Sequence, residues 1–177
     1  KTIRFFMTMK LSLTSQSIDK ISCELVVLMH FRDQLPFKDL LGKLDWRVNG
    51  RLSQYVQNEK YTGDAKELLL MPSEFRFKAN EIIILGLGEH RSFEEGHVGE
   101  VLDYFLDTAS KKKSEQVCFS IHQLLDNEFA WRNAVRLLIS KAVDYPSIKE
   151  IVLCEPVSFI RDAKKRRLDF GPHIPVE

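Results

Sequence analysis

The amino-acid sequence predicts a single α/β domain, in which a mostly parallel or mixed sheet lies between helices. Strand-like and helix-like segments alternate along the 177 residues in the order β-β-α-β-β-α-β-α-β-α, without repeats or low-complexity linkers. The run from Ile21 to Phe31 is nearly continuously apolar, as expected of a strand covered on both faces. We expect residues 1–168 to form this domain and residues 169–177, with two prolines and a glycine, to form an extended tail.

The first half of the chain begins with strand-forming residues from Ile3 to Leu13. After Pro36, which suits the first turn of a helix, apolar residues recur every three or four positions. The members of this helical stripe are Phe37, Leu40, Leu41, Leu44, Val48, Leu52, Tyr55 and Val56. Asn49-Gly50 is a turn signal inside the stripe and marks where the helix can break.

The second half alternates more regularly. Ser92 and Glu95 form a capping box before a helix, and Asp126 or Asn127 can cap a second helix that Pro146 ends. The expected strands are Glu67–Met71, Glu81–Leu85, Gln116–Ile121 and Glu150–Cys154, and the last helix is Val157–Leu168.

Composition favours an ordinary globular protein. Apolar residues make up 44% and charged residues 29%, and the net charge of +1 provides no field that steers the whole chain to nucleic acid or a membrane. Cys23, Cys118 and Cys154 lie far apart in apolar runs, which favours buried thiols over a disulfide framework or zinc ligands. We expect a cytoplasmic protein.

Searches for chemical motifs give one weak candidate for a ligand loop. Gly86 and Gly88 follow a strand and precede a helix, where a phosphate-binding loop would lie. Arg91 occupies the place of the third glycine, and Glu89 would put a negative charge beside a phosphate. A tight strand-to-helix turn and a ligand loop of Gly86, Gly88 and Arg91 both remain open.

The other patterns favour structural roles over catalysis or metal binding. His90 and His97 could share a face, but they do not form a known zinc-binding pattern. Cys118 and His122 fall on one face of a buried strand, where a nucleophile would lack access. The basic runs Lys164, Lys165, Arg166, Arg167 and Lys111, Lys112, Lys113 could contact phosphates, but without interleaved aromatic residues they favour a solvated surface. We predict no catalytic residue, no metal and no cofactor.

One stretch carries a family resemblance. It reads Glu67-Leu68-Leu69-Leu70-Met71-Pro72-Ser73, then Asn80 to Gly88 with its Gly-Leu-Gly ending, then Arg91-Ser92-Phe93, and Tyr61-Thr62-Gly63-Asp64 precedes it. This stretch resembles the N-terminal domain of the leucine aminopeptidase, or cytosol aminopeptidase, family. The resemblance implies a macro-like three-layer sandwich with a mixed, mostly parallel sheet between helices.

The resemblance also implies what the chain does. In that family a separate peptidase domain holds two metal ions around an Asn-Thr-Asp-Ala-Glu-Gly-Arg motif, which is absent here. We therefore expect a non-catalytic accessory domain that associates with itself or with a peptidase-bearing partner. The alternative implied by the macro-like fold is a module that binds ADP-ribose, against which Pro156 counts because proline offers no N–H to a phosphate.

Association requires an exposed apolar surface. The residues expected to provide it lie where the chain would cross to a second domain, and they are Phe159, Ile160, Phe170, Ile174 and Val176.

Overall fold

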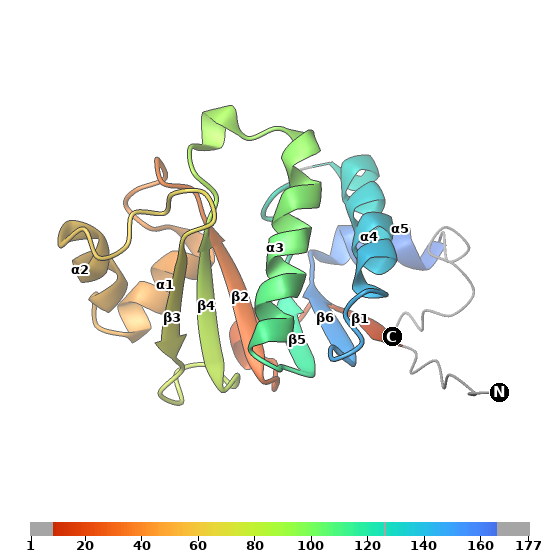
Figure 1. Cartoon of the computed structure of the whole chain (residues 1–177), viewed down its shortest axis with the longest axis horizontal. Coiled ribbons are helices and arrows are strands. Elements are labelled where there is room, and N and C mark those ends of the chain that lie inside the picture. The colour runs from red at the N-terminus through yellow and green to blue at the C-terminus, as the bar shows by residue number, and fades with distance from the viewer. Residues whose placement is uncertain (1–8, 126, 166–177) are drawn as a thin grey trace.

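A six-stranded sheet in the order β1-β6-β5-β2-β4-β3 forms the middle layer of the structure (Figure 1). The computed structural model describes residues 9–125 and 127–165. The strands are β1 (Lys10–Thr14), β2 (Leu25–His30), β3 (Leu68–Pro72), β4 (Glu81–Gly86), β5 (Gln116–Phe119) and β6 (Glu150–Cys154). All neighbouring strands are parallel except β3, which runs antiparallel to β4 at one edge. The predicted mostly parallel sheet is confirmed.

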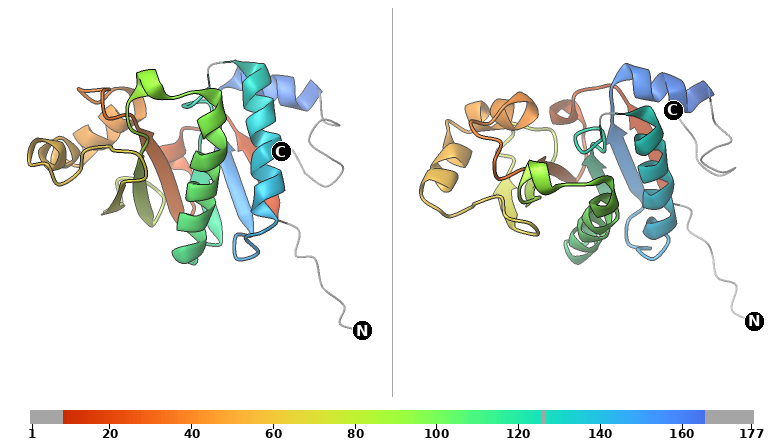
Figure 2. Two further views of the ribbon diagram at one scale, coloured as in Figure 1. Left: turned by 45° about the horizontal axis from the view of Figure 1, so that its top comes forward. Right: turned by 90° about the horizontal axis from the view of Figure 1, so that it is seen from above.

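Helices cover both faces of this sheet. They are α1 (Asp39–Arg47), α2 (Arg51–Gln57), α3 (Val98–Lys111), α4 (Glu128–Ala142) and α5 (Val157–Lys165), with short 3-10 turns at Ile18–Lys20, His90–Ser92 and Glu95–His97. Seen from above, α3 and α4 lie on one side of the sheet and α1 on the other (Figure 2). None of the helices in the described residues is long and apolar enough to cross a membrane.

The central strand β2 shows why the sheet is buried on both sides. Leu25, Val27 and Met29 belong to the core beneath α3 and α4, whereas Val26 and Leu28 belong to the core beneath α1 and α2. All six residues of β2 are buried. The nearly continuous apolar run in the sequence therefore reflects two hydrophobic cores that share one strand.

Two of the predicted helix boundaries agree with the structure. The long amphipathic stripe breaks as the turn signal indicated, because Asn49 and Gly50 have left-handed φ angles of 56° and 74° between α1 and α2. Asn127 caps α4 by accepting the N–H of Ala130 at 2.7 Å, as predicted.

The capping box predicted at Ser92 and Glu95 is wrong. Ser92 ends a 3-10 turn, and α3 begins only at Val98. Before α3, the Glu94 amide donates to Nδ1 of His97 at 2.9 Å, so the reciprocal contact forms two residues further along the chain. The sequence pattern of a capping box does not distinguish the start of an α-helix from a 3-10 turn that precedes it. In both cases side chains and turns form hydrogen bonds with the same backbone N–H groups.

Candidate functional site

Open α/β sheets bind their ligands at the carboxyl ends of their parallel strands. A cavity of about 500 Å³ lies between the loop after β2 and the loop after β5, lined in part by Phe31, Gln34, Lys38 and His122. A second cavity of about 330 Å³ adjoins it at the ends of β5, β6 and β1, where Glu155 is among its lining residues. This edge is a crevice with room for a ligand.

Glu155 is the most unusual ionisable residue of the crevice. Its side chain is buried, and its carboxylate accepts the N–H of Ile121 at 2.7 Å and the N–H of His122 at 3.1 Å. The hydroxyl of Ser120 adds a third hydrogen bond at 3.4 Å. Burial raises the pKa of Glu155 to about 7, although hydrogen bonds to the carboxylate oppose that change. The chain's own carboxylate therefore takes the backbone donors that could otherwise bind a phosphate.

Two more carboxylates act in the same way nearby. Glu67 accepts the N–H groups of Thr62 at 2.9 Å and Gly63 at 2.8 Å. Asp33 accepts the N–H of His90 at 2.8 Å, and this hydrogen bond lowers the pKa of Asp33. Backbone donors in three segments of this region are thus already satisfied by acidic side chains.

The Gly86-Leu87-Gly88 segment is hydrogen-bonded throughout. Its three N–H groups donate to the carbonyls of Glu67, His30 and Gly63, at 2.8, 2.9 and 2.9 Å in that order. A Cβ atom on Gly86 would lie 2.2 Å from the carbonyl oxygen of Asp64, so that position requires glycine for close backbone contact. These contacts favour the tight turn over the ligand loop, because the turn leaves none of these three donors for a phosphate.

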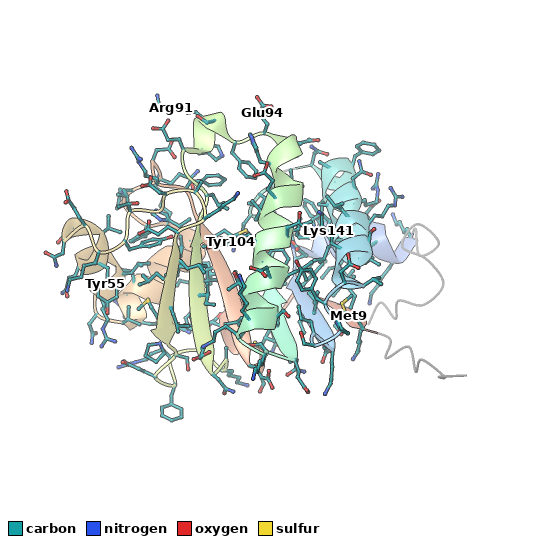
Figure 3. All side chains as sticks on the ribbon, in the orientation of Figure 1. Met9, Tyr55, Arg91, Glu94, Tyr104 and Lys141 are labelled. Atoms are coloured by element: carbon teal, nitrogen blue, oxygen red, sulfur yellow. The ribbon has the colours of Figure 1, made fainter. Side chains whose placement is uncertain are left out.

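The same turn borders a separate cavity of about 270 Å³ between β4 and α3. Gly86 and Gly88 line it, whereas Arg91 is not among its lining residues. Arg91 instead projects outward, as Figure 3 shows, and pairs with Glu89 at 3.1 Å. The structure thus brings together two of the three residues proposed for a ligand loop.

The thiols and histidines offer little chemistry. Cys23 and Cys118 are buried free thiols, as expected, while Cys154 is half-buried with its sulfur 3.2 Å from that of Cys118. His97 is held by the amide of Glu94. Among the described residues, no three His, Cys, Asp or Glu side chains are placed to hold a metal ion.

The basic runs are partly engaged with acidic residues. Lys111 pairs with Asp107 and Lys112 with Glu81, both at 2.7 Å. Lys164 and Lys165 end α5, whereas Arg166 and Arg167 lie outside the described residues.

Of the residues predicted to form an apolar surface near the C-terminus, none that the structure describes is exposed. Phe159 is buried against Trp131 and His122 because α5 packs on α4, and Ile160 is half-buried. Phe170, Ile174 and Val176 lie outside the described residues. The prediction for Phe159 is therefore wrong.

Two of the exposed apolar side chains, Leu68 and Leu70, lie on one face of the edge strand β3. Leu68 and Leu70 alternate onto the face that α3 and α4 cover elsewhere, but no helix lies in front of β3 (Figure 1). They are 42% and 49% exposed. Sequence reasoning missed this surface, although the run Leu68-Leu69-Leu70 contained its signal: apolar residues on both faces of an edge strand.

Comparison with solved structures identifies the class of fold. The macro domain of ganglioside induced differentiation associated protein 2 superposes with a TM-score of 0.70 at 16% identity, covering 94% of this chain and 86% of that one. A mutant of tomato leucine aminopeptidase superposes with a TM-score of 0.66 at 10% identity, covering 89% of this chain and 35% of that one. The predicted macro-like fold is confirmed.

Sequence comparison then gives the family. The model of the cytosol aminopeptidase family, N-terminal domain, matches residues 26–144. A probable cytosol aminopeptidase from a Sulfurihydrogenibium species is 28% identical over 109 residues, which are 62% of this chain and 22% of that protein. The chain belongs to the cytosol aminopeptidase family through its N-terminal domain, and it spans about a fifth of the length of this relative.

Proposed function

We propose that this chain is a non-catalytic accessory domain that associates with a peptidase-bearing chain of the aminopeptidase family. The observation that carries the proposal is the exposed, apolar and helix-free face of β3 around Leu68 and Leu70. The family match supports the choice of partner, because it falls on the N-terminal domain, which occupies only a fraction of the relatives' length.

Each face of a sheet is normally buried against another layer, because the transfer of apolar side chains out of water is favourable. On this face, α3 and α4 cover the strands in the middle of the sheet and on the β6 side. No helix covers β3 (Figure 1). A further element from another polypeptide would complete the layer over Leu68 and Leu70.

The test uses a double variant, Leu68→Glu with Leu70→Glu, and a control, Val143→Glu, at an apolar residue of the α4 end that is 73% exposed. Both variants are titrated by calorimetry against a purified peptidase-bearing aminopeptidase from the same cells. We expect the double variant to weaken binding at least about tenfold, while the control binds like the wild type. Equal affinities for the three proteins, or no binding by the wild type, would overturn the proposal.

A ligand in the crevice is the second candidate, and the cavity of about 500 Å³ at the strand ends is what favours it. The macro-like fold suggests ADP-ribose as the ligand. The carboxylates of Glu155 and Asp33 weigh against a diphosphate because they occupy backbone donors and add negative charge. Titration with ADP-ribose separates the two candidates.

A further inference from the structure

The turn after β3 presents an exposed phenylalanine in an unfavourable backbone conformation. Glu74 and Phe75 have φ angles of 48° and 63°, and the Arg76 N–H donates to the Ser73 carbonyl at 2.8 Å, which closes the turn. Such left-handed positions favour glycine or asparagine and cost other residues about 1–2 kcal/mol each. The Phe75 side chain is fully exposed, at 102%. Strain combined with a fully exposed aromatic ring points to a role outside the fold.

The turn is also held in place from several sides. The Arg47 guanidinium donates to the Arg76 carbonyl at 2.9 Å, and Arg51 pairs with Glu74 at 2.8 Å. Phe77, two residues after Phe75, is buried in the core. Phe75 is therefore a preorganised projection that loses little backbone freedom when it binds.

The cavity between β4 and α3, called the hole below, has a size and an apolar lining that suit an aromatic side chain. Its volume is about 270 Å³, and its apolar lining is formed by Leu85, Leu87, Phe93 and Val101. Tyr104 closes one side, and its hydroxyl donates to the Lys66 carbonyl (Figure 3). Because an apolar cavity of about 150 Å³ can hold benzene, this one has room for a phenyl ring.

The charges around the two surfaces are complementary. Glu89 and Glu100 line the cavity, where they pair with Arg91 and Lys66. Glu94 and Glu95 lie in the segment between them, so four carboxylates face two basic side chains around the cavity. Arg76 follows Phe75 directly, and its side chain is in no ion pair within the part of the chain that the structure describes. The positive charge of Arg76 beside the Phe75 ring complements the net negative charge around the cavity. This complementarity favours a second copy of this chain as the partner.

We propose that Phe75 of one copy inserts into the cavity between β4 and α3 of a second copy. The turn after β3 and the segment after β4 lie at opposite ends of β4, so a chain cannot fill its own cavity (Figure 1). The contact is therefore heterologous, with different surfaces on the two copies, and repeating it closes a ring or extends a filament. This inference goes beyond the proposed peptidase partner and extends association to the chain itself.

The test is sedimentation velocity over a wide concentration range with two complementary variants. Phe75→Ala removes the projection, and Ala65→Trp blocks the hole at an exposed lining residue, where folding should be preserved. Phe129→Ala is the control, because that ring is 66% exposed on α4, far from both surfaces in sequence. Thermal melts establish that each variant is folded.

We expect the wild type and Phe129→Ala to associate with rising concentration, and Phe75→Ala and Ala65→Trp each to remain monomeric. Mixing these two variants should produce a one-to-one dimer and nothing larger, because one retains the hole and the other the projection. A monomeric wild type, or association of Phe75→Ala equal to that of the wild type, refutes the inference. A monomeric wild type that still binds the peptidase-bearing chain refutes only this inference and leaves the proposed function intact.

Discussion

Replacing Gly86 with alanine tests whether the Gly-Leu-Gly segment is a closely packed turn. The added Cβ would lie 2.2 Å from the Asp64 carbonyl oxygen, and 2.7 and 2.9 Å from the carbonyl carbon and oxygen of Gly63. All three atoms are backbone, so no side-chain rotation can relieve the overlap. The 61–64 segment and the end of β4 must move apart.

The cost has two parts. Overpacking a tight interior site costs about 1–3 kcal/mol. The separation also strains the hydrogen bonds from Gly86 N–H to Glu67 at 2.8 Å and from Lys66 N–H to Gly86 at 3.0 Å, each contributing about 0.5–1.5 kcal/mol. We expect Gly86→Ala to lower the free energy of unfolding by about 3 kcal/mol, which corresponds to a Tm lower by roughly 10 °C for a chain of this length.

Gly96→Ala is the matched control. A Cβ on Gly96 meets no atom within 4 Å, and its φ is not positive, so alanine should change stability by less than about 0.5 kcal/mol. Urea unfolding and thermal melts of the three proteins provide the measurement. If Gly86→Ala melts as the control does, the close approach of the two segments is not a packing constraint and our interpretation of the turn fails.

Three further predictions concern chemistry and pH. The purified chain should hydrolyse no leucine amide substrate with zinc or manganese, and turnover that follows the protein peak and stops on chelation would contradict this. ADP-ribose should bind weakly or not at all in calorimetry, whereas micromolar binding that Gly88→Glu abolishes would favour a ligand site at the Gly-Leu-Gly turn. Burial raises the pKa of Glu155 from 4.5 to about 7, so its contribution to stability is present in full below pH 4.5 and is lost as the pH rises through 7. The stability of the wild type relative to Glu155→Gln should therefore fall by up to about 3 kcal/mol between pH 4.5 and pH 8 in urea unfolding, and a constant difference would show that the native pKa of Glu155 is unshifted.

The sheet was predictable because its signals are local and strong. The apolar run at β2 and the helical stripe over α3 arise from burial, which dominates the choice of residues in a core. The break at Asn49-Gly50 was predictable because left-handed φ angles favour those two residues. The start of α3 was not, because consecutive 3-10 turns satisfy the same backbone groups as a longer helix.

The site was harder to predict because its properties depend on contacts distant in sequence. Glu155 acquires its raised pKa only when α4 and the end of β5 enclose it, and Ile121 lies 34 residues away. The exposure of Leu68 depends on which strand is at the edge of the sheet and on which face lacks a helix. Phe159 was assigned to the surface because the packing of α5 against Trp131 has no signature in the sequence.

Whether the strand ends favour an anionic ligand depends on which of their backbone N–H groups are already hydrogen-bonded. At the strand ends, the carboxylates of Glu155, Glu67 and Asp33 accept backbone N–H groups from neighbouring segments. An anionic ligand would have to displace these carboxylates, which costs hydrogen bonds that the fold already makes. A partner that covers Leu68, Leu70 or Phe75 displaces only water, and each Å² of apolar surface it buries contributes about 25 cal/mol. These contacts are the reason why we propose association at the edge strand and its turn rather than ligand binding in the crevice.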